Sequence, residues 1–281
     1  MNSVLQSKND HPRDKNVEFF EEGHTYAVVF EPDKIYTSVT TWVHKHFPEF
    51  DEDATIRTIM NSKGWKYGHR YWGLNNEQIK DLWNANRIAS ANAGTALHYK
   101  IECFMNEKLL PEGYTHNELY NLYMCHYGLR HRTKSLEWKY FINFVKDHPH
   151  LVPFRTEWVI YHEDVKISGC VDMVYENSDG TLSIYDWKRS KNISRTNLWN
   201  KFAFHYQICH LPDSNFWYYA MQLNTYRVIL EDKYGKKVKD LYLVQLHPSL
   251  KEGNYRLIPM PDLSYEVRSM FQDIKQGINK V

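Results

Sequence analysis

The segment from residue 167 to residue 188 constrains this chain most, because it reads as a β-hairpin with an acidic residue on each strand. Alternating apolar residues on both sides of Ser178-Asp179-Gly180 predict two strands joined by a tight turn. Asp172 lies seven residues before Asp179, and Asp186 lies seven residues after it. Closure at this turn would therefore place the two carboxylates opposite each other.

Clustered carboxylates of this kind favour a metal site. Two nearby carboxylates repel each other unless a cation lies between them, and oxygen ligands suit Mg²⁺ or Mn²⁺ better than zinc. Asp186 and Lys188 are two residues apart, so a strand would direct both to one face. The plain alternative is an exposed hairpin on which Asp186 and Lys188 form a surface ion pair.

Composition limits the classes of protein that remain. The 281 residues suffice for one large domain or for one and a half small ones, and with 42% hydrophobic and 15% aromatic residues they can fill a sizeable core. A net charge of +1 gives no overall basic field, so any nucleic-acid binding must rely on local patches and a bound metal. We found no apolar run of membrane-spanning length and no signal-peptide pattern at the start, so we expect a soluble, intracellular protein with no membrane partner.

Residues 1–90 are predicted to form a mainly helical N-terminal extension that could act as a DNA clamp. Within it, the run SKGWKYGHRYWG at residues 62–73 interleaves cations with aromatic rings, a mixture that binds phosphates and stacks bases. An alternative is a loop whose rings fill the core and whose cations are merely solvated. The candidate DNA contacts are Trp65, Lys66, Tyr67, Arg70 and Trp72.

Residues 91–281 are predicted to form one α/β domain with the order helix, three antiparallel strands, helix, strand and a closing helix. Helices are expected at residues 76–90 and 91–107, and the second places His98 and Glu102 one turn apart. The strand at residues 154–161 brings Glu157 level with Asp172. A buried core histidine and a cross-strand surface glutamate are the alternatives for His98 and Glu157.

The connection after the hairpin is basic and polar. Its Lys191 and Arg195 could hold a phosphate backbone, although a solvated loop would have the same composition. A short helix is expected at residues 203–209, followed by a long one that ends at residue 234 and places Gln222 and Tyr226 on one face. Four scattered cysteines without a CxxC pair predict reduced thiols rather than a zinc ribbon.

Four short motifs follow one another along the chain: Gly94-Thr-Ala-Leu-His98, Gly169-Cys-Val-Asp172, Asp186-Trp-Lys188 and Gln222-Leu-Asn-Thr-Tyr226. In this order and spacing they resemble the RecB-like branch of the PD-(D/E)XK nucleases. Within that branch the chain is similar to the mitochondrial genome maintenance exonuclease and to RecB-like nucleases of large DNA viruses and phages. The resemblance implies a restriction-endonuclease-like core, in which a central mixed sheet is flanked by helices.

The resemblance also implies roles for individual residues. Asp172 and Asp186 would bind the metal together with the backbone carbonyl of Trp187, and His98 would lie beside it. Lys188 would position or polarise the attacking water. The remaining candidates are Gln222 and Tyr226, which would orient substrate or Lys188, and two supporting acids, Glu157 and Glu102.

The expected activity is that of a Mg²⁺- or Mn²⁺-dependent DNA exonuclease that acts on single strands or duplex ends. Its expected setting is DNA recombination, repair or replication, in which other proteins of these processes could be partners. An endonuclease of the same fold is the first alternative, and a nucleic-acid-binding module without catalysis is the second. We expect no iron–sulphur cluster, because no closely spaced cysteines follow Cys209, and no ATP, because GxxxxGK[ST] does not occur.

Overall fold

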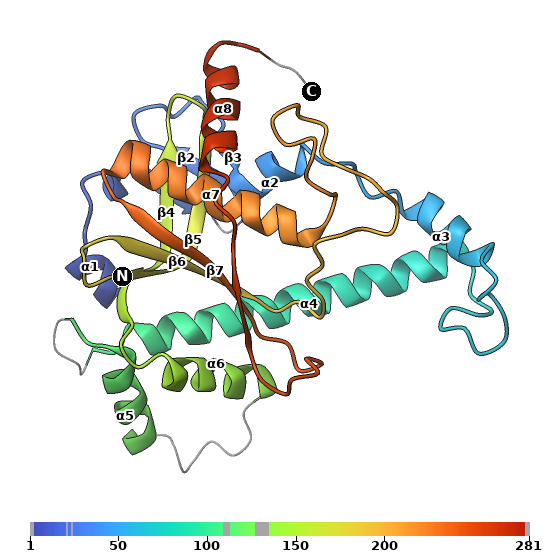
Figure 1. The fold of residues 1–281 in the computed structure, drawn as a ribbon, viewed down its shortest axis with the longest axis horizontal. Helices are drawn as coiled ribbons and strands as arrows, with labels where there is room; N and C mark the ends of the chain where they lie inside the picture. Colours follow the sequence, from blue (N-terminus) through green and yellow to red (C-terminus); the bar gives the residue numbers. More distant parts are fainter. Residues whose placement is uncertain (1–2, 21, 24, 109–112, 127–134, 279–281) are drawn as a thin grey trace. The chain divides into compact units, whose positions relative to one another are not determined.

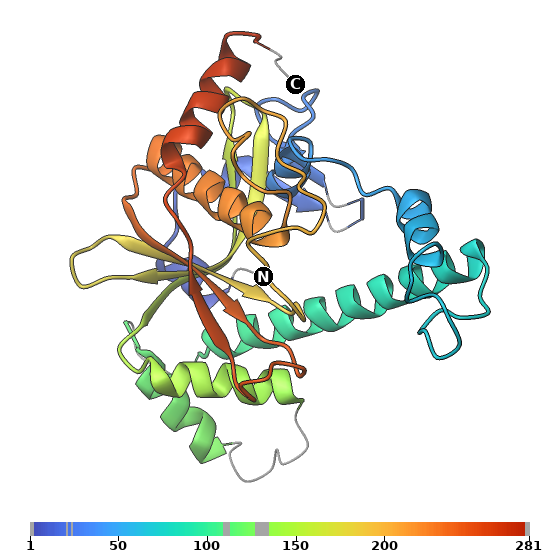
Figure 2. The ribbon, with the colours of Figure 1, turned by 45° about the vertical axis from the view of Figure 1, so that its right-hand side comes forward.

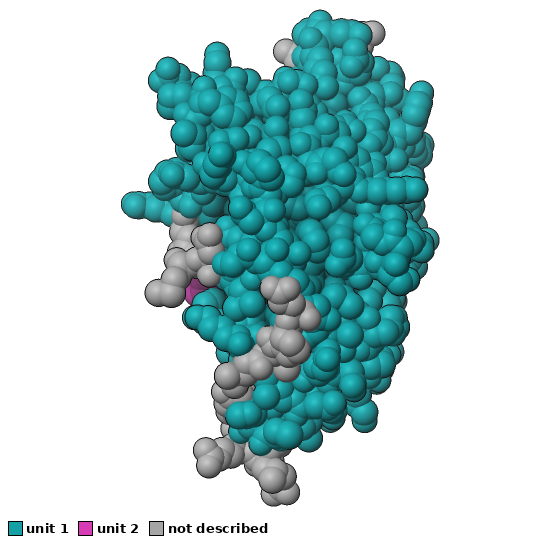
Figure 3. All heavy atoms as spheres, turned by 90° about the vertical axis from the view of Figure 1, so that its left-hand side faces the viewer, with its two compact units in different colours: residues 1–48, 97–281 teal, residues 49–96 magenta. Residues whose placement is uncertain are grey.

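The computed structural model describes residues 3–20, 22–23, 25–108, 113–126 and 135–278. The chain divides into two compact units, residues 1–48 with 97–281 and residues 49–96, which Figure 3 shows in different colours. None of the helices in the described part of the chain has the length and apolar character needed to cross a membrane.

The larger unit is built on a mixed sheet (Figure 1). Its strands follow the order β3-β5-β6-β7-β8, and β4 pairs with β5 as well. The pairs β3/β5 and β6/β7 are parallel, whereas β4/β5, β5/β6 and β7/β8 are antiparallel. The strands are β3 (Thr37–Ser38), β4 (Val152–His162), β5 (Ile167–Glu176), β6 (Leu182–Lys188), β7 (Val238–Gln245) and β8 (Arg256–Pro259).

Helices cover both faces of this sheet, as Figures 1 and 2 show. One face packs against α2 (Val39–His44), α7 (Asn215–Tyr234) and α8 (Ser264–Lys275). The other packs against α5 (His116–His126), α6 (Leu136–Asp147) and the last turns of α4 (Asn76–Met105). This arrangement confirms the predicted α/β class with a central mixed sheet flanked by helices.

The N-terminal segment joins the larger unit through α1 (Val4–Lys8), the 3₁₀ turn η1 (Asp14–Asn16) and the hairpin of β1 (Val17–Phe20) and β2 (Thr25–Val28). A buried ion pair ties it to β4, because Arg155 donates to the carboxylate of Asp14 at 2.6 Å. Trp158 donates its indole N–H to the same carboxylate at 2.9 Å.

The smaller unit contains α3 (Glu52–Met60), a connection and the first part of α4. Asp53 accepts hydrogen bonds from the Asn76 amide at 2.7 Å and from Lys80 at 2.8 Å, which fixes the start of α4 against α3. The prediction of separate helices at residues 76–90 and 91–107 is wrong, since α4 is continuous. The small residues of its middle, Ala91 to Gly94, do not interrupt it, because no proline removes a backbone donor there.

The prediction of a short helix at residues 203–209 is also wrong. The segment is a series of turns with an isolated bridge between Phe202 and Pro212. The Ala203 N–H donates to Leu211 O across this loop rather than within a helix. Local composition could not reveal this longer-range pairing.

Candidate active site

The predicted hairpin of β5 and β6 is confirmed, with Met173 opposite Tyr185 and Val174 opposite Ile184. Its turn closes between Asn177 and Thr181, where Gly180 has a φ of 75° that favours glycine. Beyond the last strand pair, the Trp187 N–H donates to Asp172 Oδ2 at 3.0 Å. The hairpin therefore holds Asp172 beside the backbone of the Asp186-Trp187-Lys188 motif.

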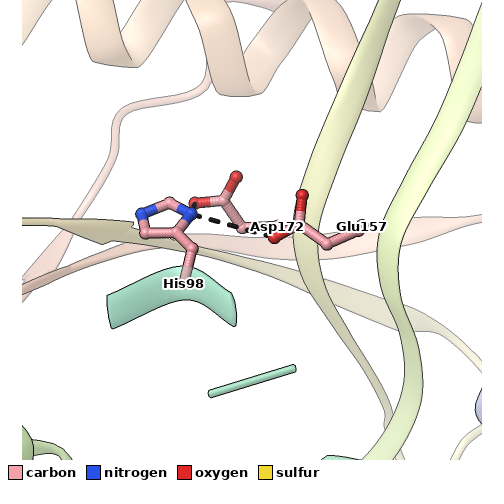
Figure 4. A group of neighbouring side chains, drawn as sticks. All are labelled: His98, Glu157 and Asp172. Carbon is pink, nitrogen blue, oxygen red and sulfur yellow. Dashed lines mark ion pairs between the residues drawn. The ribbon is translucent and has the colours of Figure 1, made fainter. Parts of the chain in front are cut away.

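Three side chains from three elements converge next to this hairpin (Figure 4). His98 comes from α4, Glu157 from β4 and Asp172 from β5. His98 Nδ1 lies 3.5 Å from Asp172 Oδ2 and 3.8 Å from Glu157 Oε1. Potential ligand atoms of the three residues all lie within 4.8 Å of one another, so this is a candidate metal-binding group.

Glu157 reaches the group through an unusual backbone conformation. Its φ of 43° lies in the left-handed region, although it sits in the middle of β4. A side chain in this region costs of order 1–3 kcal/mol, and such residues are concentrated at functional sites. The strand pairs on either side, Thr156 with Met173 and Trp158 with Val171, hold the residue in place.

The protonation of His98 follows from its partners. His98 Nε2 lies 2.8 Å from Trp187 O, and since a carbonyl only accepts, this nitrogen carries the proton and donates. The second ring nitrogen therefore faces Asp172 and Glu157. Although burial opposes the imidazolium, these two carboxylates outweigh it and raise the pKa of His98 to about 9.

This arrangement requires a positive charge between the three groups. Burial, followed by the charge of Glu157, raises the pKa of Asp172. Two ionised carboxylates at this place are therefore unfavourable without a cation beside them. In the metal-free protein, the extra proton on His98 supplies the positive charge. Two carboxylates and an imidazole nitrogen also form a suitable donor set for a divalent cation, which would replace that proton.

Asp186 lies beside this group and engages a second set of residues. Its carboxylate is buried, and Lys188 Nζ approaches its two oxygens at 3.0 and 2.7 Å. Gln222 Nε2 donates to Asp186 Oδ1 at 3.3 Å and lies 3.0 Å from the Tyr226 hydroxyl, to which it also donates. Burial and then the charge of Asp172 raise the pKa of Asp186 to about 6, against the opposing effect of Lys188.

Lys188 keeps its positive charge in this setting. Burial opposes the ammonium, but the carboxylates of Asp186 and Asp172 outweigh it and raise the pKa of Lys188. The ammonium also lies 4.9 Å from the centre of the Tyr219 ring, a cation–π contact.

Sequence reasoning missed two neighbours of the site. Tyr219 lies three residues before Gln222, so both lie on one face of α7, and this helical spacing is the signal that could have found it. Cys170 lies two residues before Asp172 on β5, and its thiol donates to Glu157 Oε2 at 3.3 Å. Period-two alternation along the strand was the available signal for Cys170.

The glycine of the Gly169-Cys-Val-Asp172 motif has a steric reason to be glycine. A Cβ added at Gly169 would lie 2.7 Å from Cε1 of Tyr226 and 2.9 Å from Cγ2 of Val39. The missing side chain therefore lets α7 and α2 pack closely on β5. This places Tyr226, and with it Gln222, next to Asp186.

We expect Gly169→Ala to lower the free energy of unfolding by about 1–3 kcal/mol, because the added methyl group overpacks a rigid contact. Denaturant titration measures this change. Gly94→Ala is the matched control, since a Cβ there meets no atom within 4 Å and alanine favours a helix. Equal stability of Gly169→Ala and the parent protein would contradict the steric account.

The remaining predicted residues lie at several places. Glu102 follows His98 by one turn of α4, and burial and the charge of Glu157 raise its pKa. Lys191 and Arg195 follow β6 in the larger unit. The smaller unit contains the other candidates, Trp65, Lys66, Tyr67, Arg70 and Trp72, of which Trp65 and Trp72 line an open pocket of about 480 Å³.

The comparison with protein families assigns the class. The profile of the PD-(D/E)XK nuclease superfamily matches residues 68–281, and the chain belongs to this superfamily. Enzymes of this class hydrolyse nucleic acids and generally use divalent metal ions.

Among solved structures, the chain is similar to a protein from Eubacterium rectale described as a "putative exonuclease". The two share 16% identity with a TM-score of 0.27, and the match covers 44% of this chain and 46% of that chain. The similarity thus spans less than half of that protein. No curated protein matches this chain.

Proposed function

We propose that this chain is a Mg²⁺- or Mn²⁺-dependent deoxyribonuclease of the RecB-like branch. Its proposed reaction is exonucleolytic cleavage of single-stranded DNA or duplex ends to 5′-phosphate products, in DNA recombination, repair or replication. The resemblance of its four motifs to those of the mitochondrial exonuclease and of viral and phage nucleases supports this proposal. The observation that carries it is the convergence of His98, Glu157 and Asp172 beside the Asp186–Lys188 ion pair.

The metal would be held by His98, Glu157 and Asp172, with Asp186 and the Trp187 carbonyl as the further ligands that the family resemblance implies. When bound, a divalent cation offsets the negative charge of the phosphodiester and makes hydroxide available near neutral pH.

The protein's own groups have separate tasks in this proposal. Lys188 presents a fixed positive charge where the nucleophile approaches, since Asp186 and Tyr219 restrain its ammonium. Gln222 orients Asp186 and is itself oriented by the Tyr226 hydroxyl. The Trp187 N–H orients Asp172. These contacts preorganise charge, which is the largest single contribution to catalysis in most enzymes.

A labelled circle tests the exonuclease proposal against the endonuclease alternative. Circular and linear single strands of equal length are incubated with the protein and Mg²⁺, together with duplexes labelled at either end. We expect linear strands to be degraded from an end and circles to persist. Cleavage of circles at the rate of linear strands would favour the endonuclease.

A binding module without catalysis is less consistent with the site. Loss of catalysis removes the reason to keep Asp172 and Asp186 together, because their mutual repulsion is costly without a cation. Asp172, Asp186 and Lys188 are all present and in contact with their partners.

The smaller unit is proposed to bind DNA through its aromatic pocket. Trp65→Ala and Trp72→Ala are each expected to weaken single-strand binding by about 1–3 kcal/mol, since each removes a ring on which a base can stack. Fluorescence anisotropy with a labelled strand measures the loss. Ile88→Ala, also exposed in this unit, is the control. Unchanged binding by both tryptophan variants would show that the pocket does not bind DNA and that its rings have only a structural role.

A further inference from the structure

The segment between β6 and α7 has a marked charge bias. From Trp187 to Pro212 the sequence contains no aspartate or glutamate but five lysines or arginines. Lys188 and Arg189 pair with Asp186 and Glu137. The other three cations, Lys191, Arg195 and Lys201, form no ion pair with any acidic residue in the described ranges. The segment thus presents uncompensated positive charge.

An ordered turn in this segment exposes apolar side chains. Asn197 Oδ1 accepts from the N–H groups of Trp199 at 2.9 Å and Lys201 at 3.0 Å, and its amide donates to Lys201 O at 2.6 Å. Within this braced turn, Leu198 is 99% exposed and Trp199 is 61% exposed. Two large apolar side chains that are exposed together on a turn held by hydrogen bonds form a candidate contact surface.

The first part of the segment, residues 190–194, is held close to Lys188 by hydrogen bonds. Gln245 on β7 donates to Ser190 O at 2.8 Å. Asn215, the first residue of α7, accepts from Ser194 N–H at 2.9 Å and donates to Asn192 O at 2.7 Å. One turn further along α7, Tyr219 contacts Lys188. Figures 1 and 2 show the segment as a broad loop that leads into the start of α7.

Arg195 is held in the same region. Its guanidinium lies 4.3 Å from the centre of the Phe216 ring, and its carbonyl accepts from the Trp217 indole at 3.0 Å. The cation is therefore placed at the start of α7 rather than free to move along the surface.

We propose that residues 191–201 bind an unpaired nucleic-acid strand next to the phosphodiester that the site cleaves. Leu198 and Trp199 contact the faces of unstacked bases, while Lys191, Arg195 and Lys201 bind the flanking phosphates. The occupant is a single strand, because neighbouring bases cover the base faces within a duplex. The inference rests on the proposed nuclease function, whose substrate class it narrows to single-stranded ends.

Abasic strands separate base stacking from phosphate binding. Affinities are measured in EDTA, which prevents cleavage, for an oligodeoxythymidylate and for an abasic strand of the same length. Trp199→Ala is expected to weaken oligodeoxythymidylate binding about 5- to 150-fold, the equivalent of 1–3 kcal/mol of stacking, and to leave abasic binding unchanged. Tyr265→Ala is the matched control, since this tyrosine of α8 is 75% exposed. It should bind both strands as the parent protein does.

Lys191→Ala should weaken binding of both strands and reduce the slope of log affinity against log salt by about 0.7. Circular dichroism of each variant verifies folding. The proposal is overturned if Trp199→Ala binds oligodeoxythymidylate as the parent does. It is also overturned if the variant loses as much affinity for the abasic strand as for oligodeoxythymidylate. Tighter binding of a blunt duplex than of the single strand would also overturn it.

Failure of the nuclease proposal has a different signature. Parallel reactions with Mg²⁺ report cleavage independently of the EDTA binding measurements. A parent protein that shows the expected strand binding but no cleavage would refute the proposed function. Cleavage that proceeds while Trp199→Ala leaves binding unchanged would refute only the single-strand surface.

Discussion

Asp186→Asn is expected to lower the rate of DNA cleavage in Mg²⁺ by at least about 10³-fold, equivalent to about 4 kcal/mol of transition-state stabilisation. Asp186 is buried and contacts Lys188 through both carboxylate oxygens. The amide removes a negative charge beside the metal-binding group and leaves the Lys188 ammonium without its partner. Initial rates on an end-labelled single strand, at saturating Mg²⁺, measure the effect.

Asp179→Asn is the control for this variant. Asp179 lies in the turn of the same hairpin, is half exposed and pairs with Lys239 rather than with site residues. We expect it to cleave like the parent protein. If Asp186→Asn retained the rate of Asp179→Asn, the assignment of the site would be wrong.

Raising the pH from 7 to 9 is expected to increase the affinity for Mn²⁺ about 50-fold. The neighbouring carboxylates raise the pKa of His98 to about 9, so its proton must leave before the ring nitrogen can hold a metal. About half of the His98 rings are unprotonated at pH 9 but only about one in a hundred at pH 7, and the affinity changes in the same proportion. Calorimetric Mn²⁺ titrations at pH 7 and pH 9 test this dependence.

The same pKa shift affects stability in the metal-free protein. A His98 pKa raised from 6.5 to about 9 contributes stability that is fully present below pH 6.5 and is lost as the pH rises through 9. Bound metal should restore stability at the alkaline end of this window. His98→Gln should abolish the pH dependence of Mn²⁺ affinity, while His150→Gln, an exposed histidine, should retain it. A parent protein whose affinity is flat between pH 7 and pH 9 would contradict the role of His98.

The sequence predicted those parts of the site that depend on local patterns. The hairpin was predictable because turn residues and alternation lie within a short segment, and this places Asp172 beside the Asp186-Trp187-Lys188 motif. The shared face of Gln222 and Tyr226 followed from helical spacing alone.

Features that depend on distant contacts were not predictable. The left-handed backbone of Glu157 is imposed by the strand pairs around it, and no local signal favours that conformation in a glutamate. The need for glycine at residue 169 comes from Tyr226 and Val39, which lie far away in the chain. The exposure of Leu198 and Trp199 was not predictable for a different reason, since apolar residues in a sequence normally indicate burial.

The most direct test of the account is cleavage of an end-labelled linear single strand by the purified protein with Mg²⁺ and, in parallel, with EDTA. Asp172→Asn is included in both conditions. The account predicts cleavage by the parent protein in Mg²⁺, no cleavage in EDTA and none by Asp172→Asn in either. Cleavage that persists in EDTA, or that Asp172→Asn performs at the parent rate, would contradict it.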